Sequence, residues 1–449
     1  MELTNKELEM MNEKIVPLLF KFGIPTMLGM IINAIYNLVD TYFIGSFGMI
    51  QTASVSIVFP LTLLITGFGV LFGNGTGSKI SRLLGNQKYQ EVSEYFSTAV
   101  ASAVLSGILL SVLLLFTLKP ILISIGADSD TLPYAIQYGT IIVVGFTFNL
   151  FNVTANNLAV AEGATLFSSI TLLLGALLNI ILDPIFVFVF HMGIEGIAYA
   201  TVLSSAVSSI IYICHFLFGK TLLPFSFKNV KPSITIYSNI CKIGIPLLAF
   251  QLLNMATLSI TNFLAVHYGN PTVTAFGITY KLFCLEVNAV FGFLKGYQPL
   301  AGYNYGAKKF KRVLDFTYKG VLVTTVFCII CNTILMIFAP QAIYLFNQDS
   351  AEVLSFGTHV LRWQAIGYMS LGFQFVGASY FLAIGKVKQG GILSLSRGIL
   401  FLFFSLLLNA IFHRTGLLCA YPLTELVASI ITIAVLFYSK KQSSVISPA

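Results

Sequence analysis

Charged residues are scarce in this chain. Asp, Glu, Lys and Arg together make up 9% of its 449 residues, against about 25% in typical soluble domains. Hydrophobic residues make up 57%, and the mean hydropathy is +0.88. A soluble core could not bury this much apolar surface. The composition therefore excludes an ordinary soluble protein and indicates a protein embedded in a lipid bilayer.

Motifs that carry catalysis are also missing from the sequence. It has no G-x-x-x-x-G-K-[ST] loop for nucleotide phosphates, no H-E-x-x-H zinc motif and no G-x-S-x-G turn. The five histidines do not cluster, and the C-x-x-C of Cys328 and Cys331 lies in an apolar run without a second pair of ligands. We therefore expect neither an enzyme nor a cofactor, and no use of ATP. The first thirteen residues are polar, so no cleavable signal peptide is expected either.

Long apolar runs dominate what is present. A helix of about 20 apolar residues crosses the hydrocarbon core of a bilayer, and twelve such runs follow one another. They lie near residues 15–45, 50–78, 94–118, 135–160, 165–190, 194–217, 240–266, 273–302, 315–341, 358–384, 391–412 and 416–438. The sequence predicts an all-α polytopic membrane protein with twelve transmembrane helices.

Basic residues gather on one side of these spans. One cluster, with Lys79, Arg82 and Lys88, follows the second span, and another, with Lys308 and Arg312, follows the eighth. Cytoplasmic loops carry the excess of Lys and Arg, so both termini are expected in the cytoplasm, which agrees with an even number of spans. The net charge of +8 then reflects membrane topology, and no nucleic-acid partner is expected.

The chain repeats itself after six spans. KFGIP at 21–25 recurs as KIGIP at 242–246, and the same spacing aligns LLGNQKYQEV at 83–92 with NYGAKKFKRV at 304–313. Because six is even, both halves enter the membrane in the same direction, and a pseudo-twofold axis along the membrane normal relates them. The predicted domains are an N-lobe over 1–217, a cytoplasmic connection over 218–239 and a C-lobe over 240–449. Two-lobed transporters of this kind bind substrate between the lobes and work by alternating access.

Two aspartates interrupt the apolar runs of the first half. Asp40 lies in NAIYNLVDTYFIG, and Asp183 lies in LLNIILDPIFVF. An ionisable side chain at membrane depth is costly and marks a functional site. In the second half the residue corresponding to Asp40 is Thr261, and the run corresponding to Asp183 reads LFLFFSLLLN. Ion coupling is therefore expected in the N-lobe.

Further polar residues should join these aspartates. Tyr36 lies one helical turn before Asp40, Asn179 lies one turn before Asp183, and the sixth span brings Thr201 to a similar depth. Their carboxylate, amide and hydroxyl oxygens suit Na⁺, which would bind at Asp40, Asp183, Asn179 and Thr201. The same setting suits a proton, because burial disfavours a charged carboxylate. The residue types leave H⁺ and Na⁺ both open as the coupling ion.

Other polar residues are candidates for the wall of a substrate cavity. Asn33 and Asn37 lie on the polar stripe of the first span, and Asn152 and Asn156 belong to a group of four asparagines in the fourth. Glu286 is a carboxylate within the eighth span, where a structural ion pair explains it as well as a substrate contact does.

Two prolines fall within spans that carry these residues. Pro25 and Pro184 each remove an intrahelical hydrogen bond, and Pro184 frees the carbonyl of Ile180. Either kink could act as a hinge, although membrane helices also carry prolines for packing.

Taken together, the motifs resemble those of a known family. They stand in order along the chain: YNLVDTYFIG, GNGTGSKISRLLGN, NIILDPIFVF, GIEGIAYAT, GFLKGYQPLAGYNYGAKKFKRV and AIGKVKQGGILSLSR. They resemble the multidrug and toxic compound extrusion (MATE) family, and within it the prokaryotic DinF-like branch, over essentially the whole chain.

The resemblance implies a monomeric antiporter in the cell membrane that exports organic cations and other amphipathic small molecules in exchange for H⁺ or Na⁺. It places the ion site of the N-lobe around Asp40 and Asp183, with Tyr36, Asn179 and Thr201 beside them. It also matches Pro25 to a kinking proline of the first span.

The chain departs from the family pattern at one place. Val160 stands where an arginine usually does, which leaves Glu162 without its expected local partner.

A second class of function stays open. A flippase for lipid-linked or other amphiphilic substrates, from the same wider superfamily, would carry basic residues in its central cavity, and Lys281 and Lys295 lie within the eighth span. The buried carboxylates favour the antiporter, and the duplicated halves disfavour a channel or a receptor.

Overall fold

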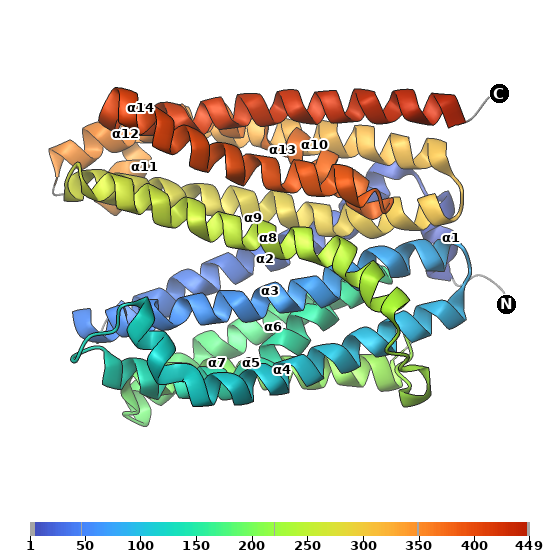
Figure 1. Ribbon diagram of the computed structural model, residues 1–449, viewed down its shortest axis with the longest axis horizontal. Helices are drawn as coiled ribbons and strands as arrows, with labels where there is room; N and C mark the ends of the chain where they lie inside the picture. Colours follow the sequence, from blue (N-terminus) through green and yellow to red (C-terminus); the bar gives the residue numbers. More distant parts are fainter. Residues whose placement is uncertain (1–4, 46, 220, 348–349, 447–449) are drawn as a thin grey trace.

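The structure, a computed structural model, describes residues 5–45, 47–219, 221–347 and 350–446. These residues form helices joined by short turns and contain no strand (Figure 1). A bilayer favours this architecture because backbone groups in lipid must bond within their own segment. The elements are α1 (Asn5–Asn12), α2 (Ile15–Gly45), α3 (Met49–Gly85), α4 (Tyr89–Ile125), α5 (Leu132–Ala161), α6 (Thr165–Pro184), η1 (Ile185–Val189), α7 (Gly193–Phe218), η2 (Phe227–Asn229), α8 (Ile234–Val266), α9 (Asn270–Gly306), α10 (Phe310–Ile337), α11 (Ala339–Phe346), α12 (Ala351–Tyr368), α13 (Leu371–Ala383) and α14 (Val387–Ile446).

The predicted spans correspond to these helices. Within the described ranges, 10 helices are long and apolar enough to cross a bilayer. The last of them, α14, turns back on itself at His413 (φ 53°, ψ −133°) and so supplies two spans (Figure 1). Helices α12 and α13 follow each other across a break at Met369 and Ser370 and together occupy the place of the tenth span. The expectation of an all-α protein with twelve spans is confirmed.

The helices form two lobes. In the first, α5 lies against α3, α4 and α7, and α6 lies against α2 and α7. In the second, α14 lies against α8, α12 and α13, and α9 lies against α10 and α12. The blue-to-green half and the yellow-to-red half lie on opposite sides of the molecule (Figure 1). The exact limits of the connection at 218–239 stay a prediction, and its Lys220 lies outside the described residues.

Corresponding turns of the two lobes have the same backbone shape. Gln87 (φ 58°), between α3 and α4, corresponds to Lys308 (φ 59°), between α9 and α10. Gly48 (φ 105°) and Gly269 (φ 92°) likewise precede α3 and α9. Left-handed backbone is costly for residues with a side chain, so its recurrence at matching positions supports the pseudo-twofold relation.

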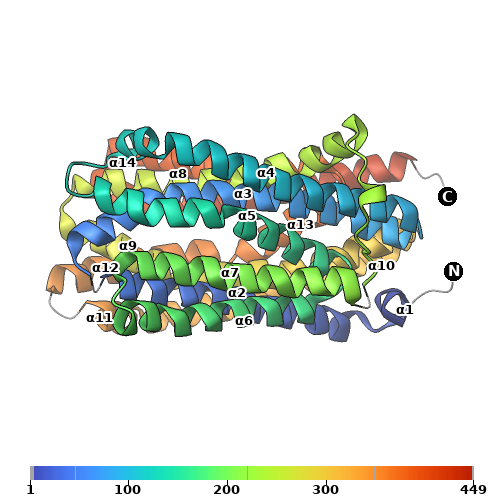
Figure 2. The same cartoon turned by 90° about the horizontal axis from the view of Figure 1, so that it is seen from below.

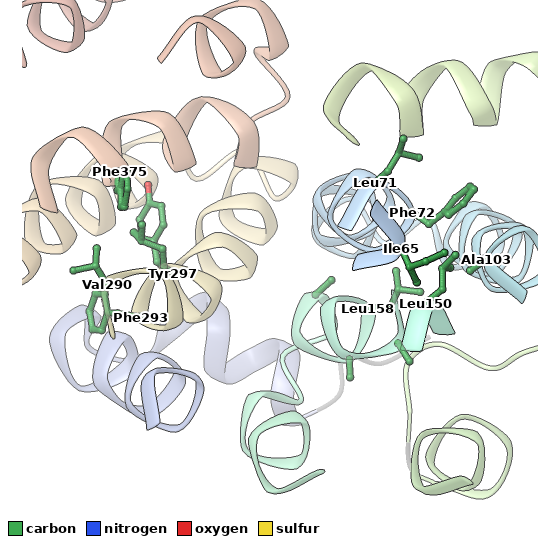
Figure 3. Packing of buried hydrophobic residues seen from close by; sticks show 14 of the residues in the cluster. Ile65, Leu71, Phe72, Ala103, Leu150, Leu158, Val290, Phe293, Tyr297 and Phe375 are labelled. Carbon is green, nitrogen blue, oxygen red and sulfur yellow. The ribbon is translucent and has the colours of Figure 1, made fainter. Parts of the chain in front are cut away.

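Each lobe contains a share of an extensive apolar core (Figure 3). Ile65 and Phe72 of α3 and Leu150 of α5 are buried in the first lobe, and Tyr297 of α9 and Phe375 of α13 are buried in the second. Lipid tails are as apolar as these side chains, so close packing, more than removal from water, selects the neighbours of each helix.

The two lobes meet where α2 lies on α9 and α3 lies on α8. Both termini lie at the same end of the molecule (Figure 2). There, a Cβ on Gly85 would lie 2.0 Å from the carbonyl oxygen of Tyr303, and a Cβ on Gly306 would lie 2.1 Å from that of Arg82. Only glycine permits this approach, so the lobes are closed against each other at this end.

Candidate ion-coupling site

Asp40 and Asp183 come from different helices of the first lobe and lie within electrostatic reach of each other. Asp40 is near the end of α2, and Asp183, near the end of α6, is 0% exposed. Pro184 follows directly, and there the α-helix gives way to the π-helical turn η1. The proline lacks the N–H that a regular helix would use, and π-helical turns are frequent at functional sites. A hinge at Pro184 stays a prediction.

Asn179 connects Asp183 to the neighbouring helix α7. In the orientation that satisfies both ends of its amide, the nitrogen donates to Asp183 Oδ2 at 3.1 Å, and the oxygen accepts from the backbone N–H of Thr201 at 3.2 Å. Asn179 is 2% exposed. The amide therefore fixes Asp183 in place and leaves its second oxygen available.

Tyr36 completes the cluster. It lies beside the side chain of Thr201 and within electrostatic reach of Asp40 and Asp183. All five predicted ion-coupling residues thus lie in one place. Tyr138 of α5, which is 6% exposed, lies within reach of the same groups. It was not predicted, because it is one of 20 tyrosines and no asparagine or acidic residue lies one turn away from it.

One carboxylate oxygen of each aspartate has no hydrogen-bond partner. Among the described residues, Asp40 Oδ1 and Asp183 Oδ1 are buried and have no hydrogen-bond partner. Buried polar atoms nearly always have a partner, and an unpaired buried charge is costly. The pocket is therefore chemically suited to take up a proton or a monovalent cation.

The predicted cavity asparagines have different surroundings. Asn37 is exposed and donates to the carbonyl of Asn33 on the same helix at 2.7 Å. Asn152 ties α5 to α7, because it donates to the carbonyl of Ser205 at 2.7 Å and accepts from Ser209 Oγ at 2.9 Å. A role of these residues in lining a cavity stays a prediction.

Asn156 reaches the other lobe. Its Nδ2 donates to Ser168 Oγ at 2.5 Å and to Tyr212 Oη at 3.0 Å, and its Oδ1 accepts from Lys295 Nζ of α9 at 3.0 Å. This contact is a polar bond between the lobes in largely apolar surroundings. The sequence could not show it, because the two residues lie 139 positions apart.

Glu286 lies inside the second lobe, away from the aspartates. It is 5% exposed and accepts from Asn332 Nδ2 of α10 at 2.7 Å. The buried ion pair of this lobe is formed instead by Glu425 and Arg397 at 2.5 Å, with Gln374 donating to Glu425 at 2.9 Å. Contact of Glu286 with substrate stays a prediction.

Pro25 lies in a helix that is continuous from Ile15 to Gly45. On one side of it, a Cβ on Gly296 would lie 2.4 Å from the carbonyl oxygen of Phe22, and on the other a Cβ on Gly292 would lie 2.5 Å from Met27 Cα. Pro25 therefore sits between two close contacts of α2 with the opposite lobe. Its role as a hinge stays a prediction.

Glu162, which lacks its expected local partner in the sequence, finds partners from a distant part of the chain. This residue is 0% exposed, is hydrogen-bonded with His215 Nε2, and accepts from Thr221 Oγ1 and from the backbone N–H of Leu222, each at 2.7 Å. It therefore anchors the chain that follows α7 to the turn that follows α5. The partners lie 53 to 60 positions later in the sequence, beyond any local pattern.

Comparisons with known proteins agree with this architecture. The sequence model of the MatE family matches residues 25–185 and 246–413, one segment in each lobe. The chain is 28% identical over 426 residues to the multidrug export protein MepA of Staphylococcus haemolyticus, and 26% identical over 425 residues to that of Staphylococcus saprophyticus subsp. saprophyticus. Both alignments cover 94% of each chain.

Solved structures share the fold. A multidrug resistance MATE family transporter of the MOP superfamily, in an outward-facing conformation, is 23% identical with a TM-score of 0.92 over 99% of both chains. A MOP superfamily transporter from Pyrococcus furiosus, whose binding pocket is described as reversed in polarity, is 23% identical with a TM-score of 0.91 over 100% of both chains. At this identity the likeness supports the fold alone. The family match across both lobes and the membrane-spanning helices show that the chain is an integral membrane protein of the MatE family of multidrug efflux transporters.

Proposed function

We propose that this protein is a secondary active antiporter that exports organic cations and amphipathic compounds in exchange for H⁺ or Na⁺. The observation that carries the proposal is the pair of aspartates Asp40 and Asp183, each with one buried oxygen that no described residue satisfies. Two carboxylates in an apolar lobe are costly and are not needed for packing. An ion-coupled transporter needs such groups, because it must bind and release an ion within the membrane.

Ion loading would act through the charge of the pocket. A proton or Na⁺ bound at a free oxygen neutralises one negative charge of the pair, while Asn179, held by Thr201, keeps Asp183 oriented. The empty pocket carries unpaired negative charge in an apolar lobe, which is unfavourable. Loaded and empty states therefore favour different conformations, as coupling requires.

The pocket is connected mechanically to the opposite lobe by α2. This helix carries Tyr36 and Asp40, and its earlier part is pressed against Gly292 and Gly296 of α9. A change in the bend of α2 at Pro25 would alter the contact between the lobes. If the end carrying both termini is cytoplasmic, the present structure is closed towards the cytoplasm and represents a state that releases substrate outside.

The proposal is tested in liposomes that contain the purified protein. Efflux of ethidium is followed under an imposed pH gradient and then under a Na⁺ gradient, for the wild type and for Asp40→Asn. We expect one gradient to drive efflux in the wild type and neither to drive it in the variant. Asp130→Asn is the matched control, because it makes the same change at an exposed residue. Full efflux by Asp40→Asn would refute the site.

A second candidate function rests on Lys295. Its ammonium group lies at the lobe interface, bonded to Asn156, where a flippase would meet the phosphate of an amphiphilic substrate. In the same liposomes, transfer of a fluorescent phospholipid analogue without ethidium efflux, lost in Lys295→Gln, would favour the flippase over the antiporter.

A further inference from the structure

A second buried polar cluster lies in the lobe that lacks the aspartates. Glu286 of α9 and Asn332 of α10 form its centre, where Asn332 Nδ2 donates to Glu286 Oε1 at 2.7 Å and also to the carbonyl of Cys328 at 2.8 Å. Glu286 is 5% exposed, and Asn332 and Cys328 are 0% exposed. This carboxylate is therefore largely shielded from water, and it lies in the opposite lobe from the Asp40–Asp183 pocket.

Two acceptor oxygens of the Glu286–Asn332 pair have no hydrogen-bond donor. Glu286 Oε2 and Asn332 Oδ1 are both buried, and neither finds a hydrogen-bond donor in the described part of the chain. A carboxylate and an amide oxygen can only accept, so the charged form of Glu286 cannot satisfy its neighbour. A carboxylic acid has an O–H to donate. Protonation of Glu286 would therefore remove its charge and turn one of its oxygens into a donor.

The charges around Glu286 do not balance without that proton. The groups that act on it from the helices packed around α9 are Arg397 and Glu425 of α14 and the thiols of Cys328 and Cys331 of α10. Arg397 is already paired with Glu425 at 2.5 Å, and Gln374 donates to the other oxygen of Glu425 at 2.9 Å. An ionised Glu286 would therefore leave one net negative charge inside the lobe, which is costly.

We propose that Glu286, beside Asn332, is a second proton-binding site, which holds a proton in this conformation. The reaction is a simple transfer of H⁺ between water and the carboxylate, in which only an O–H bond forms or breaks. The geometry favours a proton over a metal cation, because the cluster offers two free acceptor oxygens and a cation such as Na⁺ needs more ligands than these.

Release of this proton would act on a break in the tenth span. Arg397 stacks over Tyr368, the last residue of α12, at 5.2 Å and over Phe375 of α13 at 5.5 Å. It therefore touches both sides of the break at Met369 and Ser370. A charged Glu286 would compete with Glu425 for Arg397 and so change the packing across the break.

The test is infrared spectroscopy of the purified full-length protein in lipid nanodiscs. The parent is Asp40→Asn/Asp183→Asn, which removes the carboxyl signals of the other pocket. We expect a carboxylic-acid C=O band that shifts when H₂O is replaced by D₂O and when the protein is made with isotopically labelled glutamate. The band should disappear in Glu286→Gln and remain in Glu425→Gln. The glutamine at 286 keeps both a donor and an acceptor for Asn332, so this variant should fold.

Each outcome decides the proposal. A parent without the acid band, or a band that survives Glu286→Gln, would overturn it. The isotope shift assigns the band to glutamate even if Glu425→Gln fails to fold. The infrared measurement does not require transport. Its result therefore tests the protonation of Glu286 independently of the proposed antiport. A last consequence rests on the proposed antiport. If that antiport is driven by H⁺, Glu286→Gln should lower the number of protons exchanged per substrate by one.

Discussion

Closure of the lobes at the end that carries both termini should depend on two glycines. Alanine at position 306 would place its Cβ 2.1 Å from the carbonyl oxygen of Arg82, and alanine at position 85 would place its Cβ 2.0 Å from that of Tyr303. These contacts are with backbone atoms, which cannot rotate away as a flexible side chain would. Each substitution must therefore push α3 and α9 apart.

The size of the effect follows from the cost of overpacking. Forcing one methyl group into a closely packed contact costs about 1–3 kcal/mol, which corresponds to a shift of roughly 5- to 150-fold in the ratio of two conformations. Gly277→Ala is the matched control. It lies on the same helix α9, and its Cβ would meet no heavy atom within 4 Å.

The shift can be measured as a distance between the lobes. Spin labels are placed at Gln90 of α4 and Lys311 of α10, which are exposed and occupy corresponding positions in the two repeats, after the six native cysteines are replaced. We expect Gly85→Ala and Gly306→Ala to move the distribution towards longer distances, while Gly277→Ala leaves it unchanged. If Gly306→Ala gives the same distribution as Gly277→Ala, the glycine contact does not hold the lobes closed.

Three further predictions concern single side chains. Arg397→Gln should lower the free energy of unfolding by about 3–5 kcal/mol, because it leaves Glu425 charged and unpaired. Lys21→Gln removes an exposed lysine from its ion pair with the half-buried Glu9 and should cost less than about 1 kcal/mol. Equal melting temperatures of the two variants would contradict this. Glu162→Gln should weaken the hydrogen bonds to Thr221 and Leu222 by about 1–3 kcal/mol. Amide hydrogen exchange over residues 221–223 should then become faster. Unchanged exchange rates would contradict the role of Glu162 in anchoring this segment. Asn179→Leu should raise the ion concentration for half-maximal transport by roughly 10- to 100-fold, as expected when a group that orients an ion ligand is lost; Asn152→Leu is its control, and an equal effect of both would contradict the assigned role.

Much of the fold could be predicted because the relevant signals are local or repeated. Helix positions follow from apolar runs, as in the predicted span 15–45, which is α2. The relation between the lobes follows from the sequence repeat, and the matching backbone at Gln87 and Lys308 agrees with it. The five ion-coupling residues could be grouped because helical spacing and depth bring them together.

The rest depends on tertiary contacts that leave no local pattern. The break at Met369 and Ser370 was not predicted, because its flanking residues read as a continuous apolar span. The partners of Glu162 and the bond between Lys295 and Asn156 join residues far apart in sequence. The unsatisfied oxygens of Glu286 and Asn332 become visible only when all their neighbours are placed.

The central claim is that the Asp40–Asp183 pocket exchanges an ion for substrate, and the most direct measurement is the reverse reaction. Proteoliposomes are given an ethidium gradient with no ion gradient, and the movement of H⁺ or Na⁺ is recorded. Coupling is reciprocal, so substrate flowing one way should drive one ion the other way in the wild type and drive none in Asp183→Asn. Ethidium flux without ion movement in the wild type, or equal ion movement in Asp183→Asn, would contradict the account.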